Sequence, residues 1–117
     1  MLQLVPQMRI LPCVEPVDFR RGVDALTSLC RRDLNVDPFS GALFVFRNRA
    51  ATSIRLLVYD ETGFWICTKR LSQGRFSWWP RTAGSQLEPI AARHLQVLLA
   101  NGNPLAARFA PEWRKLA

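Results

Sequence analysis

The sequence has little of what metal centres, nucleotide-binding loops and membrane spans are made from. It contains one histidine, His94, and three cysteines far apart in the chain, Cys13, Cys30 and Cys67, so it offers neither a zinc ligand set nor a disulfide framework. We expect the cysteines to be small buried hydrophobic residues. The six glycines are scattered singly, which excludes a glycine-rich phosphate loop. The apolar runs are short and no basic segment precedes one at the start, so we expect a cytoplasmic protein without a membrane span or a cofactor.

Acidic residues are also few, nine against sixteen basic ones. A nuclease or transposase site needs two or three carboxylates that converge on divalent metal ions. The best candidates are otherwise explained: Asp18 by a helix cap, Asp37 and Asp60 by turns, and Asp24 by its arginine neighbours. No GxSxG motif supplies a nucleophile for His94. We therefore expect no catalytic residues, no metal site and no enzymatic activity.

Apolar side chains and arginine are abundant. With 117 residues, 49% of them hydrophobic, including seven Phe and four Trp, the chain can form one domain over residues 1–117, and residues 104–117 are expected to be a loosely packed tail. The net charge is +7, from fourteen arginines and only two lysines against the acidic residues. Arginine neutralises phosphate and donates in a bidentate fork, which favours a polyanionic partner. An alternative stays open: coding sequence rich in G and C also favours arginine, and a basic surface aids solubility.

Hydrophobic periodicity predicts two helices. Residues 18–32 place apolar side chains at spacings of four, three and four, with Asp18 as the N-cap. The second helix lies between Pro89 and Gly102, which are typical of a helix start and of the position just past a helix end. Its apolar side is formed by Leu87, Ala91, Leu95 and Leu98.

Alternating residues predict strands in the rest of the chain. A first strand is expected at 8–14, and further strands at 42–46, 54–59, 64–69 and 76–79, with turns near 47–53, 60–63 and 72–74. Gly63 and Gly74 suit left-handed turn positions. We expect an α+β fold: a mainly antiparallel meander of four or five strands with two principal helices, the first on one face and the second on the same face or at an end.

The predicted loops carry the candidate binding residues. Arg47 and Arg49 share one loop, Lys69, Arg70 and Arg75 flank another, and Arg55 lies on the strand between them; all six are predicted nucleic-acid contacts. Whether the two loops share an edge of the sheet depends on strand order, which the sequence does not fix; adjacent loops of a simple meander point in opposite directions, which counts against one continuous patch formed by turns alone. Trp78 and Trp79 should face opposite sides of a strand, one in the core and the other free to pack under a helix, contact a partner or stack on a base.

An ordered series of motifs resembles a transposon protein family. It comprises DFRRGVDAL (18–26), DPFSGALFVFRNR (37–49), Tyr59-Asp60, Thr62-Gly63-Phe64, Lys69-Arg70-Leu71 and Gly74-Arg75-Phe76. The series is similar to the TnpB-type accessory protein, the second open reading frame product, of the insertion sequence sixty-six (IS66) family. The resemblance implies a non-catalytic helper in the transposition of a bacterial insertion sequence, whose transposase is encoded separately.

Two functions remain open within that resemblance. In the first, arginine-rich loops bind DNA and the protein assists the transposase. In the second, the protein is an interaction subunit that does not bind DNA: its arginines meet an acidic surface of the transposase or another transposon-encoded protein, and an exposed tryptophan anchors the contact.

Overall fold

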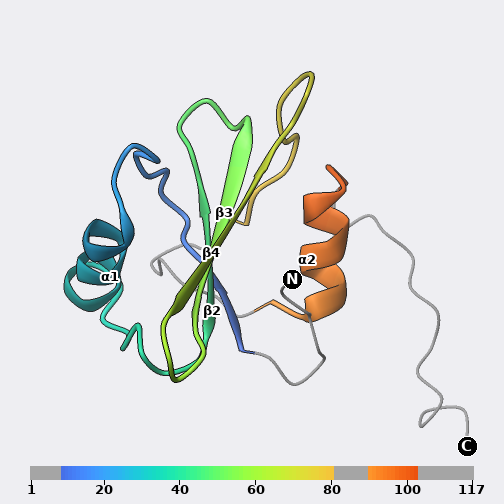
Figure 1. Ribbon diagram of the computed structural model, residues 1–117. Coiled ribbons are helices and arrows are strands. Elements are labelled where there is room, and N and C mark those ends of the chain that lie inside the picture. Colours follow the sequence, from blue (N-terminus) through green and yellow to red (C-terminus); the bar gives the residue numbers. More distant parts are fainter. Residues whose placement is uncertain (1–8, 81–89, 103–117) are drawn as a thin grey trace, which may run out of the picture.

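The chain forms its elements in the order β1, α1, β2, β3, β4, α2 (Figure 1). The computed structural model describes residues 9–80 and 90–102. The expectations for Met8, Leu87, Pro89 and the 104–117 tail lie outside these ranges. The elements are β1 (Ile10–Pro12), α1 (Val23–Arg32), β2 (Leu43–Arg47), β3 (Ser53–Tyr59), β4 (Phe64–Arg70) and α2 (Ala92–Leu99). Neither helix in the described ranges has the length and apolar character to cross a membrane.

The strands form a four-stranded sheet in the order β1-β2-β3-β4. The pairs β2–β3 and β3–β4 are antiparallel, as expected, but β1 runs parallel to β2, with Ile10 beside Leu43. The α+β class is therefore confirmed, with a mixed sheet of four strands rather than five in the described part of the chain. The parallel pair is possible because the long connection through α1 carries the chain back to the starting end of β1.

The prediction of a strand at 76–79 is wrong. This segment leaves the sheet after the turn at Gly74 and joins the β2–β3 loop to the end of β1. The Phe76 amide donates to the Ala51 carbonyl at 2.7 Å, and the Trp79 indole Nε1 donates to the Cys13 carbonyl at 2.9 Å. These contacts replace strand pairing, so local alternation did not determine the structure here.

The two helices cover opposite faces of the sheet (Figure 1). On one face Leu26 and Cys30 of α1 pack with Phe44 and Phe46; on the other, the buried residues of α2 pack with the second set of strand side chains, which includes Leu43, Val45, Ile54, Leu56 and Val58. The expected placement of the second helix on the same face or at an end is therefore wrong. The physical reason lies in β2, whose apolar residues point to both faces and need a cover on each.

Helix α1 begins later than predicted. Gly22, not Asp18, occupies the N-cap position, and the helix starts at Val23. Asp18 instead caps a tight local turn: its carboxylate accepts from the Arg20 amide at 2.9 Å and from the Arg20 guanidinium at 2.9 Å. Phe19 consequently lies in the loop before the helix, where its ring is free to contact β3.

The end of α2 agrees with the prediction in position. Asn101 adopts the left-handed conformation (φ 63°), the Asn101 amide donates to Leu98 and the Gly102 amide donates to the Val97 carbonyl at 2.8 Å. Gly102 is needed for space, because a Cβ there would lie 2.8 Å from the Val97 side chain.

The β3–β4 turn differs from the prediction in its details. Glu61, with φ of 80°, takes the left-handed position that was expected for Gly63. The Asp60 carboxylate holds this turn by accepting from the Thr62 amide at 3.1 Å and the Gly63 amide at 3.0 Å. Gly74 does have positive φ, 75°, as expected.

Candidate nucleic-acid interface

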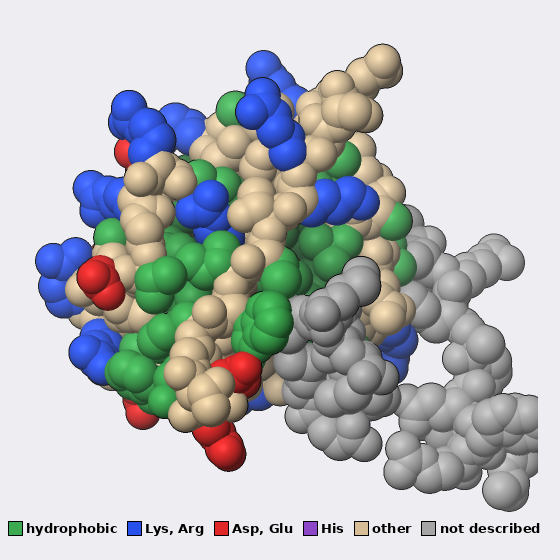
Figure 2. Space-filling view, viewed as in Figure 1, with side chains coloured by type: hydrophobic (Ala, Val, Ile, Leu, Met, Phe, Trp, Pro, Cys, Tyr) green, Lys and Arg blue, Asp and Glu red, His purple; other side chains and the backbone are tan. Residues whose placement is uncertain are grey.

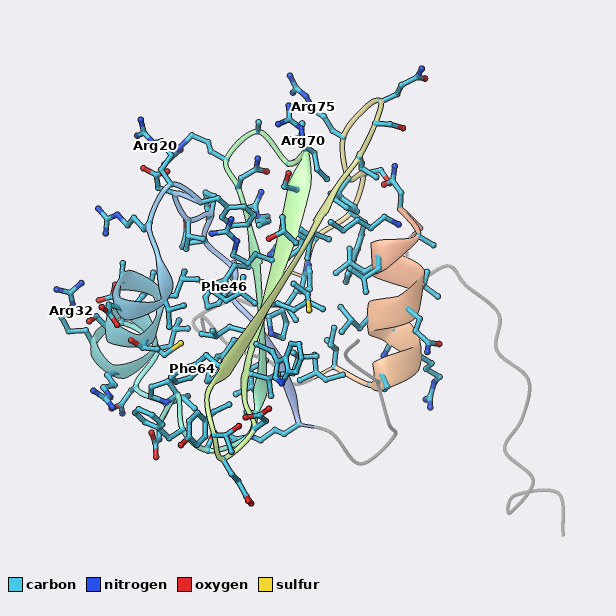
Figure 3. All side chains as sticks on the ribbon, viewed as in Figure 1. Arg20, Arg32, Phe46, Phe64, Arg70 and Arg75 are labelled. Atoms are coloured by element: carbon cyan, nitrogen blue, oxygen red, sulfur yellow. The ribbon has the colours of Figure 1, made fainter. Side chains whose placement is uncertain are left out.

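The strand directions bring several basic loops to one end of the sheet. Strands β1, β2 and β4 end there and β3 begins there, at the top of Figure 1. We call this the basic end and define it by four exposed side chains: Arg20, Arg49, Arg70 and Arg75. Figure 3 shows Arg20, Arg70 and Arg75 projecting outward at this end, and Figure 2 shows basic side chains gathered above it.

The sequence left open whether the two basic loops share one end of the sheet, because that depends on strand order; the structure brings them together. Adjacent loops of a meander do alternate, but the β2–β3 loop and the segment after β4 are two connections apart and return to the same end. They are also bonded together: the Leu71 amide donates to Thr52 O at 2.9 Å, and the Phe76 amide donates to Ala51 O at 2.7 Å. Arg49 and Arg75 therefore project from one connected framework.

Asn48 organises the β2–β3 loop that carries Arg49. Its side-chain oxygen accepts from the Thr52 amide at 2.9 Å and from the Ser53 amide at 3.1 Å, and its amide nitrogen donates to Thr52 Oγ1 at 2.9 Å. Ala51 adopts a left-handed conformation, φ 58°. These bonds fix the loop backbone, so Arg49 projects from a defined position rather than from a loose tip.

Three of the predicted contacts are exposed and available. Arg49, Arg70 and Arg75 form no hydrogen bond or ion pair through their side chains with another residue in the described ranges. The backbone of the Arg75 loop is held by α2, because Asn101 Nδ2 donates to the Arg75 carbonyl at 3.1 Å and Asn101 Oδ1 accepts from the Ser77 amide at 2.9 Å. Free cations on a supported backbone suit contact with a charged partner.

Arg47 and Arg55 are half-buried and engaged within the chain. Arg47 Nη2 donates to Val14 O at 3.2 Å, and its guanidinium lies 5.7 Å from the centre of a Trp79 ring. Arg55 Nη1 donates to Phe19 O at 3.0 Å, and its guanidinium stacks 4.5 Å from the Phe19 ring centre. Arg47 does not enter solvent as expected of a loop residue, since it is the last residue of β2.

Lys69 is exposed but has a local partner. Its Nζ donates to the carbonyl of Leu99, the last residue of α2, at 2.6 Å. A cation at this position compensates the negative end of the helix dipole. Lys69 therefore ties β4 to α2.

Trp78 and Trp79 are both half-buried and both pack against the core beneath α2. The expectation that one faces each side of a strand fails because their segment is not a strand. The Trp79 indole has its hydrogen-bond acceptor within the chain.

A groove opens at the basic end between the loop that follows β1 and the β2–β3 loop. Its volume is about 660 Å³, and it is lined by Pro16, Val17, Asp18, Phe19, Arg20, Asn48, Arg49 and Ala50. Arg20 on one wall and Arg49 on the other supply positive charge. Sequence reasoning missed Arg20 because it assigned residues 18–32 to a solvated helix; the glycine at position 22 was the signal for a later helix start.

Asp18 modifies the charge on one wall of this groove. The Arg20 guanidinium bonds to its carboxylate and lowers the pKa of Asp18 from 3.8 to about 2. Asp18 is therefore ionised at neutral pH and offsets part of the Arg20 charge. Arg49 faces no such carboxylate in the described ranges.

The opposite end of the sheet carries three exposed acidic residues, Asp37, Asp60 and Glu61, and also the exposed Arg31, whose guanidinium lies 5.2 Å from the centre of the Phe39 ring. Figure 2 shows acidic side chains at this lower end. Hydrogen bonds from Thr62, and one from the Trp65 indole, lower the pKa of Asp60. Within residues 9–80 and 90–102, no three His, Cys, Asp or Glu side chains are grouped so that they could hold a metal ion.

The fold and the basic end define a small α+β protein with a charged, supported surface, and comparison with known proteins identifies its family. The family described as IS66 Orf2 like protein matches residues 8–107, and the chain belongs to this family. The resemblance to the IS66 second open reading frame product is thus confirmed, and the protein is a transposition accessory protein by family.

Two curated relatives come from Sinorhizobium fredii (strain NBRC 101917 / NGR234). Uncharacterized protein y4jC is 37% identical over 78 residues, which cover 67% of this chain and 67% of the relative. Uncharacterized protein y4hO is 32% identical over 100 residues, which cover 86% of this chain and 85% of the relative. No solved structure matches the chain.

Proposed function

We propose that this non-catalytic accessory protein binds the DNA backbone with its basic end in the cytoplasm and so assists the separately encoded transposase. One observation carries the proposal: Arg49, Arg70 and Arg75, which have free side chains among the described residues, lie with Arg20 at one end of the sheet, while Asp37, Asp60 and Glu61 lie at the other. This separation of charge gives the molecule an electric dipole along the sheet, which a net positive charge spread evenly over the surface would not give.

The geometry favours contact with phosphates over contact with bases. The exposed arginines of the basic end lie in loops or at a strand end, and no described helix carries them along one face as a recognition helix in the major groove would. Guanidinium groups on supported loops match phosphate oxygens, which carry no sequence information. We therefore expect weak sequence preference.

The groove between Arg20 and Arg49 supplies a place for the backbone. Phe19 lines it, and the Arg55 guanidinium holds that ring in place. A strand passing through the groove would meet positive charge on two sides. Arg47, Arg55 and Lys69 support this surface through their contacts within the chain, and the proposal assigns the direct phosphate contacts to Arg20, Arg49, Arg70 and Arg75.

The test is a salt series with a charge-matched control. The double change Arg49→Ala and Arg75→Ala removes two free cations from the basic end. The control, Arg9→Ala and Arg32→Ala, removes two exposed cations elsewhere: one precedes β1 and the other lies at the end of α1. DNA affinity is measured by fluorescence anisotropy between 50 and 200 mM salt, with element-end and random DNA.

Each phosphate contact contributes about 0.9 to the slope of log affinity against log salt, so the first variant should lower the slope by about 1.8 and the control by much less. Equal losses in both variants contradict the assignment to the basic end. Absence of DNA binding at low salt contradicts the proposal itself, and capture by purified transposase without DNA would then favour the interaction-subunit function.

A further inference from the structure

Strand β4 is an open edge of the sheet in the described part of the chain. It pairs with β3 along its whole length, from Arg70 opposite Ser53 to Phe64 opposite Tyr59, and with no other described strand. Figure 1 views the sheet along this edge, with β4 in front. In the same view, Figure 2 shows the β4 backbone flanked by apolar side chains on both sides.

The direction of the free backbone groups follows from the pairing. The Leu71 amide donates to Thr52 on the β3 side, and the Asp60 amide donates to Gly63. In an antiparallel ladder the bonded positions alternate, so the odd-numbered residues of β4 bond to β3. The N–H and C=O groups of Phe64, Ile66, Thr68 and Arg70 therefore point outward from the sheet.

Apart from the cations Lys69 and Arg70 at its end, this edge lacks the usual protection against pairing. Its register with β3 is continuous, without a bulge, and the strand contains no proline. Lys69 is turned toward α2 by its bond to Leu99 O. The middle of the strand, residues 65–68, carries no charge, and Trp65 is 48% exposed.

Charge at the two ends of β4 indicates which strand fits the edge. The strand follows the acidic turn of Asp60 and Glu61 and ends in Lys69 and Arg70, with Arg75 in the next loop. In an antiparallel pair of β4 strands, the acidic turn of the second copy lies beside Lys69 and Arg70 of the first. Lys69 and Arg70 of the second copy in turn lie beside the acidic turn of the first. Figure 3 shows Phe64 and Arg70 at the two ends concerned. The edge is thus self-complementary in charge and in backbone direction.

We propose that a second copy of this chain pairs antiparallel along β4, which joins the two sheets into one continuous sheet with a two-fold axis at Cys67. This register pairs the whole strand: Phe64 lies opposite Arg70 of the second copy, and Trp65 lies opposite its Lys69. The first is an aromatic–cation pair, while Lys69 keeps its bond to Leu99 O. The basic ends then lie at opposite ends of the joined sheet, so a dimer presents two separate DNA-binding surfaces if the proposed function holds.

The register makes a chemical prediction about Cys67. Its own backbone groups bond to β3, so the two Cys67 residues form a non-hydrogen-bonded pair, with Cα atoms about 4.5 Å apart. That spacing lies in the range that a disulfide can bridge. The other two cysteines make internal controls, since Cys13 and Cys30 are buried, and burial raises the pKa of their thiols to about 11 and about 12.

The experiment uses the full chain without DNA, so its result is independent of the proposed function. Sedimentation equilibrium should give twice the 13.4 kDa mass of one chain. Treatment with diamide should give a disulfide-linked dimer on a non-reducing gel. Cys67→Ser should abolish that band, and Cys13→Ser should leave it.

A charge variant tests the proposed neighbours. Glu61→Arg places a cation beside the basic end of the second copy and should weaken the dimer roughly five- to tenfold at low salt. Glu15→Arg, the same change at an exposed site after β1 on the far edge of the sheet, should leave the dimer unchanged. A monomer at all concentrations overturns the proposal, as does a dimer that forms no Cys67 disulfide and is as strong in Glu61→Arg as in the unmodified chain.

Discussion

Replacing Arg55 should destabilise the fold, although the residue is a cation in a strongly basic protein. Arg55 Nη1 donates to Phe19 O at 3.0 Å, Nε donates to Thr68 Oγ1 at 3.1 Å, and the guanidinium stacks on the Phe19 ring. These contacts join β3, β4 and the loop before α1. The side chain therefore links segments that are distant in sequence.

The magnitude follows from the contacts. Each hydrogen bond contributes about 1 kcal/mol and the cation–π contact about 0.5–1 kcal/mol for a half-buried pair. Arg55→Met, which keeps the aliphatic stem, should therefore lower the free energy of unfolding by about 2–3 kcal/mol. For a domain of this size that corresponds to a fall in Tm of roughly 8–12 °C. Arg55→Lys should recover less than half of the loss, because an ammonium cannot reproduce the planar fork.

The assay is urea denaturation followed by circular dichroism, with a thermal scan alongside. Arg49→Met is the matched control: it removes the same charge from an exposed loop and should change stability by less than about 0.5 kcal/mol. A loss of unfolding free energy below about 1 kcal/mol in Arg55→Met, or equal losses in the two variants, would refute this structural role of Arg55.

Three further predictions concern single contacts. Ala51→Gly should stabilise the protein by about 0.5–1 kcal/mol in urea, since Ala51 has φ of 58°. The pKa of Asp18 is lowered, so its pairing stabilises the fold above pH 4 and is lost as pH falls toward 2; an NMR titration of its carboxyl should give a pKa of about 2, and Arg20→Ala should return it toward 3.8. Lys69→Met removes the cation that caps α2 at Leu99 and should speed amide hydrogen exchange in the last turn of that helix.

Sequence periodicity predicted the elements better than their arrangement. Helix α1, helix α2 and strands β2 to β4 lie close to their expected positions, because their apolar residues repeat at the helix or strand period. The start of α1 was misplaced because Asp18 is a good N-cap by type but bonds Arg20 locally instead. The segment 76–79 was misassigned because its partners, Ala51 and Cys13, are distant in sequence. Local patterns do not contain that information.

The placement of the second helix was predictable in part. The run of buried residues in β2, Leu43 to Phe46, has no polar alternation, which is typical of a strand covered on both faces. Each face needs its own helix, and residues 9–80 and 90–102 provide two. The continuous apolar run was therefore stronger information on the layer arrangement than the antiparallel pairing of the neighbouring strands.

The arginines show what composition leaves undecided. Arg55 lies in a strand between the buried Ile54 and Leu56. A half-buried charged side chain at such a position needs hydrogen-bond acceptors within the fold, so it is not available to a partner. Arg49 lies in a loop in which Asn48 accepts from the Thr52 and Ser53 amides, and its own guanidinium has no partner in the described part of the chain and remains available to one. Position within an element, rather than the count of charges, separates the arginines that support the fold from those that can bind phosphate. For the proposed DNA binding, the free loop cations rather than the net charge of +7 set the number of phosphate contacts to expect.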